Sequence, residues 1–155
     1  MRRRDNLIGT RLLSVLAALC LLVSPLARAV SIDDWLSETH DGMLHTTDMG
    51  ECVLENDQVI EACRLTFRTY GRLAPDLSNI VLMPTWLNGN AEGLATYNYL
   101  GPDGIVDTDD YFVIAVNALG NGISSSPSNS AQSPFPAFTI RDQVCLLYTS
   151  DAADD

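Results

Sequence analysis

The side chains that could perform chemistry are few in this sequence. Three consecutive serines, Ser124, Ser125 and Ser126, are candidate nucleophiles. A serine attacks only when a neighbouring base takes its proton, and histidine is the usual base. The two histidines, His40 and His45, lie far upstream, and no Gly-x-Ser-x-Gly motif occurs. We therefore expect the serines to form a polar loop.

Two other groupings carry weak chemical signals. His40, Asp41 and His45 are of the residue types that bind metals, but in a linker-like stretch we expect them to be solvated, and we predict no metal site. Residues 120–122 (GNG) lack the third glycine of a dinucleotide-binding loop. We therefore expect no cofactor.

Two apolar runs, residues 79–84 and 111–116, predict the strands that would position a site. Each is continuous and bounded by turn signals, which favours a strand covered on both faces. Residues 91–100 between them predict a helix, so the unit is a parallel crossover of an α/β sheet. Ligands bind outside the carboxyl ends of such strands, so we expect the site in loops 85–90 and 117–126.

A β-hairpin is predicted over residues 51–71 from two β-rich runs around an Asn/Asp tip. A turn at residues 57–58 places Cys52 opposite Cys63, and a turn at residues 56–57 offsets them by two. Bridged cysteines need Cα atoms within about 7 Å. Both a disulfide and two buried thiols therefore remain open.

The other segments have weaker patterns. Residues 30–50 have no sustained period and predict a loosely packed leader, with one helical turn near residues 34–37. Residues 124–136 have the composition of a flexible linker. Residues 139–144 predict the start of a helix, with Thr139 as its cap and Asp142 three positions on.

Both ends of the chain differ in kind from the middle. Residues 1–29 combine an arginine-rich start, an apolar run over residues 12–23 and a final Ala-Arg-Ala, which is typical of a secretory signal peptide. We therefore expect a periplasmic or secreted protein with no membrane attachment after cleavage. Residues 145–155 (CLLYTSDAADD) resemble a translated sequencing adapter, so we interpret only residues 51–144 as native α/β domain.

The charge of the chain excludes some partners. Its 155 residues carry 9 basic residues, all arginine, against 20 acidic ones, a formal net charge of −11. Nucleic acids and anionic membrane surfaces would be repelled. A small-molecule ligand is the partner that we expect.

Four segments in order resemble the N-terminal part of the homoserine O-acetyltransferase-like family of the α/β-hydrolase fold. They are residues 79–89 (NIVLMPTWLNG), 100–108 (LGPDGIVDT), 111–120 (YFVIAVNALG) and 135–144 (FPAFTIRDQV). With the upstream hairpin, the resemblance covers about residues 54–144. It implies an N-terminal part of the sheet that stops before the nucleophile elbow, so that the Ser-His-Asp triad is absent and the fragment inactive. The family also implies a homodimer.

The resemblance implies a role for the loop after residue 84. The family's Leu-Thr-Gly aligns with residues 87–89, so the backbone N–H of Leu87 would be one donor of the oxyanion hole. Trp86, Asn88, Gly89 and Asn117 would surround the substrate.

Three departures from the family affect this site. Thr85 replaces a usual His, Trp86 replaces a small residue, and Ser126-Pro127 replaces Gly-Pro. They alter the pocket mouth and leave the acyl acceptor open. Export would also separate the protein from cytosolic acetyl-CoA. We therefore expect serine-based acyl transfer or ester hydrolysis of a small acyl donor or ester by the full-length enzyme. The alternative is a non-catalytic binding protein on the same fold.

Overall fold

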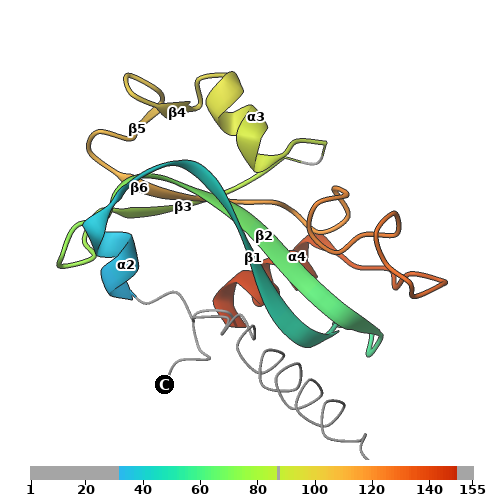
Figure 1. Cartoon of the computed structure of the whole chain (residues 1–155). Coiled ribbons are helices and arrows are strands. Elements are labelled where there is room, and N and C mark those ends of the chain that lie inside the picture. The colour runs from blue at the N-terminus through green and yellow to red at the C-terminus, as the bar shows by residue number, and fades with distance from the viewer. Residues whose placement is uncertain (1–31, 87, 150–155) are drawn as a thin grey trace, which may run out of the picture. The chain divides into compact units, whose positions relative to one another are not determined.

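The computed structural model describes residues 32–86 and 88–149, and the expected signal peptide lies outside these residues. The described elements follow one another along the chain (Figure 1). They are α2 (Ile32–Ser37), β1 (Thr39–Val53), β2 (Val59–Arg72), β3 (Ile80–Pro84), α3 (Ala91–Thr96), β4 (Leu100–Gly101), β5 (Val106–Asp107), β6 (Phe112–Val116) and α4 (Ile140–Thr149).

A mixed four-stranded sheet with the strand order β1-β2-β6-β3 organises the fold. β1 pairs with β2 and β2 with β6 in antiparallel fashion, whereas β3 and β6 are parallel. The chain passes from β3 to β6 through α3 and the short parallel pair β4–β5. The predicted α/β fold with an opening hairpin and a parallel crossover is confirmed.

The opening hairpin is longer than the sequence pattern indicated. β1 begins at Thr39, so residues 39–50, expected in a loosely packed leader, instead form most of a sheet strand. The expected helical turn before it is present as α2. The apolar pattern of β1 is weak because many side chains of this edge strand are exposed. Backbone pairing with β2 holds the strand in the sheet.

One face of the sheet is covered by α3. Val81 and Met83 of β3 and Val113 and Ala115 of β6 pack with Leu94 of α3 in a hydrophobic cluster. The helix begins at Ala91 and is capped by Asn90, whose side chain accepts a hydrogen bond from the N–H of Gly93. It ends at Thr96, earlier than the expected position 100.

β3 is covered on one face only, which corrects the expectation of a fully buried strand. Ile80 and Leu82 alternate with the residues that face α3 and are 42% and 50% exposed. β3 is also the last strand of the described sheet. Its apolar run therefore correctly predicted a strand. The described residues cover that strand on one face and not on both.

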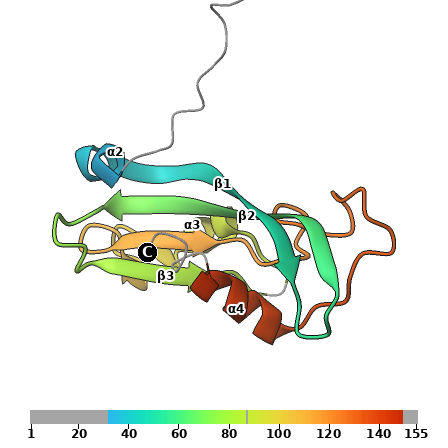
Figure 2. The same cartoon turned by 90° about the horizontal axis from the view of Figure 1, so that it is seen from below.

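The opposite face carries α2 and α4 (Figures 1 and 2). Trp35 of α2 packs on Phe112 of β6, and Leu146 of α4 lies in a core cluster with Leu65 of β2. Leu146 belongs to the segment that we interpreted as adapter-derived, and the structure continues α4 through it. In the described part of the chain, no helix is long and apolar enough to cross a membrane.

The start of α4 forms the predicted reciprocal cap. The Thr139 N–H donates to Asp142 Oδ2 at 2.7 Å, and the Asp142 N–H donates to Thr139 Oγ1 at 3.2 Å. Asp142 Oδ1 also accepts from the N–H of Glu55 in the hairpin loop at 2.7 Å. These hydrogen bonds, first that from Glu55 and then that from Thr139, lower the pKa of Asp142.

Candidate functional site

The loops that follow β3 and β6 start side by side. The Thr85 N–H donates to the Val116 carbonyl at 3.0 Å, which extends the parallel pairing by one residue. Thr85 Oγ1 then accepts from the Ala118 N–H at 3.1 Å. Thr85, at the position where the resembling family usually has His, therefore joins the two loops.

Asn117 ties these loops to the rest of the sheet. Its side chain is 1% exposed, and Oδ1 accepts from the N–H of Ala91 at the start of α3 at 2.9 Å. Nδ2 donates to Thr66 Oγ1 at 3.1 Å, and the Asn117 N–H donates to the Thr66 carbonyl at 2.9 Å. Asn117 lines the candidate site, but its polar atoms are engaged in holding β2, β6 and α3 together.

A cavity of about 530 Å³ opens between these loops and α4. Its walls come from both strand ends, the Asn117 loop, the chain before α4 and α4 itself. They are Leu65, Pro84, Thr85, Asn88, Val116, Asn117, Ala118, Leu119, Gly120, Phe138, Ile140, Gln143, Val144 and Leu147. None of these described wall residues is charged, and none is a serine, cysteine or histidine. They can bind an apolar group but cannot supply a general base.

The predicted loop residues 86–89 are placed differently from one another. Asn88 lines the cavity, and Leu87 lies outside the described residues. The Gly89 N–H donates to the Trp86 carbonyl at 2.9 Å and closes a tight turn. Trp86 is 41% exposed and packs against Tyr97 and Tyr99, beside the cavity and not among its wall residues.

Gly89 is required by the position of Trp86. A Cβ atom at residue 89 would lie 2.4 Å from Cε2 of the Trp86 ring, closer than atoms can approach. The ring therefore lies directly over the backbone of Gly89.

Several wall residues are not among those expected from the sequence. The only sequence signal for Leu65 is the alternation of side chains along β2, the strand in which the structure buries it. Ile140, Gln143, Val144 and Leu147 have the spacing of one helix face. This spacing is visible in the sequence, but Leu147 lies in residues 145–155, which we interpreted as non-native. The sequence predicts only the start of this helix, over residues 139–144.

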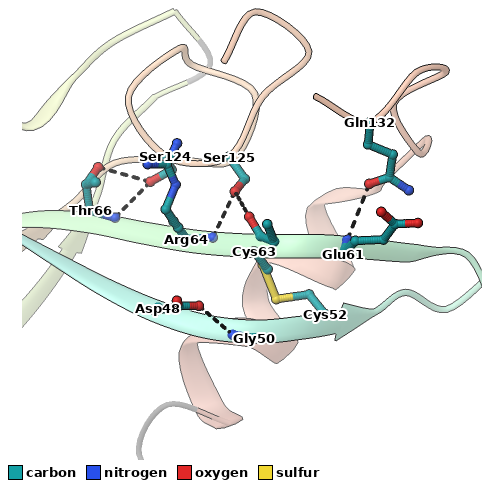
Figure 3. The surroundings of a disulfide bond; sticks show 11 residues. Asp48, Gly50, Cys52, Glu61, Cys63, Arg64, Thr66, Ser124, Ser125 and Gln132 are labelled. Carbon is teal, nitrogen blue, oxygen red and sulfur yellow. Dashed lines mark hydrogen bonds between the residues drawn. A yellow bond between two sulfur atoms is a disulfide. The ribbon is translucent and has the colours of Figure 1, made fainter. Parts of the chain in front are cut away.

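The serine-rich segment is packed against β2, which corrects its interpretation as a flexible linker (Figure 3). Beyond the residues paired with β6, the edge of β2 is satisfied by this segment. Ser124 Oγ accepts from the Thr66 N–H at 3.0 Å, and Ser125 Oγ accepts from the Arg64 N–H at 2.8 Å. Further along, Gln132 Oε1 accepts from the Glu61 N–H at 3.3 Å. These serines serve the fold, and the described histidines lie elsewhere.

The expectation that the histidines are solvated is wrong. His40 is 8% exposed, and its Nδ1 lies 2.8 Å from Thr69 Oγ1. His45 Nε2 lies 2.9 Å from the same hydroxyl. Burial, and secondarily the charge of His40, lower the pKa of His45. Within residues 32–86 and 88–149, no group of three or more His, Cys, Asp or Glu side chains is placed to hold a metal ion.

The two hairpin cysteines are joined. Cys52 and Cys63 form a disulfide with Cα atoms 5.7 Å apart, in a core cluster with Leu65 and Leu119 of the cavity wall (Figure 3). The strand pairing matches neither turn considered from the sequence. Val53 pairs with Val59 across a five-residue loop, and an irregularity then brings Gly50 opposite Cys63.

The mixed sheet, its parallel crossover and a site at the carboxyl ends of β3 and β6 define the N-terminal part of an α/β-hydrolase fold. A solved structure of an acetyl esterase matches 79% of this chain with a TM-score of 0.66 and 29% sequence identity, over 35% of its own length. No protein-family model matches the sequence.

Sequence comparison gives the same relationship. A probable esterase of Corynebacterium glutamicum is 40% identical over 66% of this chain and 31% of its own length. A homoserine O-acetyltransferase of Nocardia farcinica is 34% identical over 73% of this chain and 33% of its own length. The resemblance to this group of esterases and homoserine O-acetyltransferases is confirmed, and the chain spans about a third of the length of these relatives.

Proposed function

We propose that this chain is the N-terminal part of a longer exported enzyme that hydrolyses small acyl esters with a serine nucleophile. The observation that carries the proposal is the apolar cavity at the carboxyl ends of β3 and β6. This is where α/β enzymes bind their ligands. The homology to esterases and acetyltransferases supports acyl chemistry at that place.

The residues of this chain would bind the substrate and stabilise the negative charge that develops on its carbonyl oxygen. Val116, Leu119 and Phe138 would contact its apolar part. When a nucleophile attacks the ester carbonyl, the oxygen becomes negative, and a backbone N–H directed at it lowers the barrier. The Leu87 N–H would be that donor, as the sequence resemblance implies. The serine, histidine and acid would come from residues that follow position 144 in the longer protein.

The cavity wall supports ester hydrolysis over transfer to homoserine. Homoserine carries an ammonium and a carboxylate, and a protein that selects it needs side chains that pair with these charges. None of the described wall residues is charged. An uncharged acyl ester, with water as the acceptor, fits this part of the wall, which the residues that follow position 144 would complete.

Export rests on the sequence of residues 1–29, outside the described residues, and on one structural observation. The Cys52–Cys63 disulfide is buried in the core. Structural disulfides persist in oxidising compartments such as the periplasm and are rare in the cytosol. A fusion of residues 1–29 to a reporter that is active only outside the cytoplasm should therefore be active, and one of residues 30–144 should not.

The longer reading frame tests the enzymatic function. It should continue from residue 144 through a helix into a Gly-x-Ser-x-Gly-like elbow, with Asp and His following. The encoded protein should hydrolyse a short ester such as p-nitrophenyl acetate and should lose activity when the elbow serine is changed to alanine. CoA release that depends on homoserine would contradict the hydrolase preference. A frame without the elbow would instead indicate a binding protein on this fold.

A further inference from the structure

Three exposed aromatic side chains gather beside the cavity, against the end of α3. Trp86 is 41% exposed, Tyr97 67% and Tyr99 42%. The centroid of the Trp86 ring lies 6.0 Å from that of Tyr97 and 5.9 Å from that of Tyr99. We call these three side chains the aromatic platform. A contiguous exposed patch of large side chains next to a cavity is typical of a surface that binds a ligand.

The indole of Trp86 is held in place by two glycines. A Cβ atom at Gly89 would overlap the ring, and one at Gly93 would lie 3.3 Å from its Cη2. Gly93 lies inside the six-residue helix α3, although glycine is a poor helix former. Its presence leaves room for the indole along the helix. One indole face therefore rests on the backbone, and the tyrosine rings meet the indole at 54° and 63°, so neither covers it by stacking.

The two tyrosines are fixed by the turn that follows α3. Asn98 between them has a φ of 57°, a left-handed conformation that asparagine adopts more readily than most residues. The Tyr97 N–H donates to the Gly93 carbonyl at 2.9 Å. The Tyr99 N–H donates to the Leu94 carbonyl at the same distance. The backbone of the platform is thus held to α3 before any ligand arrives, which lowers the entropy that binding costs.

The polar atoms of the platform are available to a ligand. Within the described residues, no hydrogen bond engages the Trp86 indole N–H or the hydroxyls of Tyr97 and Tyr99. The indole N–H can donate, and each hydroxyl can donate and accept. A ligand on the platform can therefore combine contact with the rings and hydrogen bonds at their edges.

The platform adjoins the cavity through the loop that follows β3. Thr85 and Asn88, which stand on either side of Trp86 in this loop, both line the cavity. Asn88 is exposed, and its amide forms no hydrogen bond with another described residue. A molecule that fills the cavity can therefore extend past Asn88 to the platform.

We propose that the aromatic platform binds a pyranose ring and that the substrate is a sugar esterified with a small acyl group, an inference that rests on the proposed ester hydrolysis. The acyl group would occupy the cavity. Water would replace the sugar oxygen on the acyl carbon, which releases a carboxylic acid and leaves a hydroxyl on the sugar. The rest of the sugar, held on the platform, would orient the ester.

The chemistry of a sugar matches the platform better than that of other ligands. One face of a pyranose presents C–H groups of slight positive charge, which the negative face of an aromatic ring attracts. Its hydroxyls can pair with the free polar atoms, which a purely apolar group would leave unused. Aromatic faces also bind cations, but Glu92, the carboxylate of α3, already pairs with Arg68 at 3.4 Å.

NMR of the indole N–H groups in the full 155-residue chain tests the platform apart from catalysis. The probes are the methyl β-pyranosides of glucose, galactose and xylose, none of which is an ester. At least one should shift the Trp86 resonance and saturate at about 1–10 mM, as expected for a ligand of this size. The Trp35 resonance, whose Nε1 is buried, should stay unchanged. Glycerol has hydroxyls but no ring face and should shift neither resonance.

Two results of this titration would overturn the proposal. One is the absence of a saturable Trp86 shift with all three glycosides, and the other is an equal shift with glycerol. Tyr97→Leu and Tyr99→Leu keep an apolar side chain without the ring, and each should weaken binding by about 2–10-fold. Tyr148→Leu, which removes an exposed ring of α4 outside the platform, is the control and should bind like the parent. Unchanged affinity in both platform variants would also overturn the proposal.

The longer enzyme separates this inference from the proposed function. It should hydrolyse both an acetylated methyl glucoside and ethyl acetate, whose alcohol part is too short to cover the platform. Tyr97→Leu should raise KM for the sugar ester more than for ethyl acetate, with a smaller effect on kcat. Activity on neither ester would contradict the proposed function. Hydrolysis of both esters with equal changes in KM would contradict the platform alone.

Discussion

Cys63 lies opposite Gly50 in the β1–β2 ladder but is bonded to Cys52, two residues further along β1. β2 contains one more residue than β1 between the pairs Cys52–Ile60 and Gly50–Cys63. This bulge brings the two Cα atoms to 5.7 Å, within the range that a disulfide spans. The bond thus fastens the hairpin at its irregularity, beside the cavity wall.

The disulfide should stabilise the fold measurably. Cys52→Ala combined with Cys63→Ala removes a cross-link between residues 11 positions apart, which should lower the free energy of unfolding by about 3 kcal/mol. Urea unfolding of the variant and of the parent checks this. Cys145→Ala, which alters a thiol outside the disulfide, should have little effect. Equal stability of the parent and the double variant would show that the bond is not formed in solution.

The serine-rich segment should contribute to stability as part of the sheet. Ser124 is 0% exposed, accepts from the Thr66 N–H and donates to the Asn117 carbonyl. Ser124→Ala leaves both groups without these partners and should cost about 1–3 kcal/mol in urea unfolding. The control Ser37→Ala removes an exposed hydroxyl and should change stability by less than about 0.5 kcal/mol. A flexible linker would give the same small change for both.

The local patterns in the sequence were the ones that could be interpreted correctly. The cap formed by Thr139 and Asp142 needs residues only three positions apart, and the β3–α3–β6 crossover follows from apolar runs and their lengths. Ser124 accepts a hydrogen bond from Thr66, which lies 58 positions earlier in the chain, and the composition of the segment does not predict that partner. His40 was likewise assigned to solvent because Thr69 is 29 positions away.

Dependence on residues far apart in the chain also limited what the sequence could predict about the disulfide and the cavity wall. The register near Cys63 depends on a bulge that no turn rule predicted. The two site loops were found because the ends of parallel strands must share an edge. The cavity wall from α4 required the helix to be placed in space.

The stability of the chain should fall in acid through Asp142. Backbone hydrogen bonds from Glu55 and Thr139 lower the pKa of this carboxyl below its ordinary value of 3.8. In the unfolded chain the group therefore binds a proton first as the pH falls. Its contribution is complete well above pH 3.8 and is lost as the pH drops through the lower folded value.

The comparison of two variants isolates that contribution. Asp142→Asn should be less stable than the parent at pH 7, and its stability should decline less steeply below pH 4. Asp103→Asn, which removes an exposed carboxylate, should follow the parent. Thermal unfolding between pH 2.5 and pH 7 provides the measurement, and parallel curves for the parent and Asp142→Asn would refute the role of this carboxylate.

The backbone N–H of residue 87 can be tested in the longer enzyme without knowledge of its substrate. Leu87→Pro removes the N–H, whereas Leu87→Ala keeps it and shortens the side chain. Loss of one oxyanion donor should lower kcat by about 10²–10³, or roughly 3–4 kcal/mol, with a smaller change in KM. Leu87→Ala should keep most of the activity. Since proline also restricts the Trp86 backbone, tryptophan fluorescence must show that Trp86 still packs on Gly89 and Tyr97. Full activity of a folded Leu87→Pro enzyme would assign the donor to another residue.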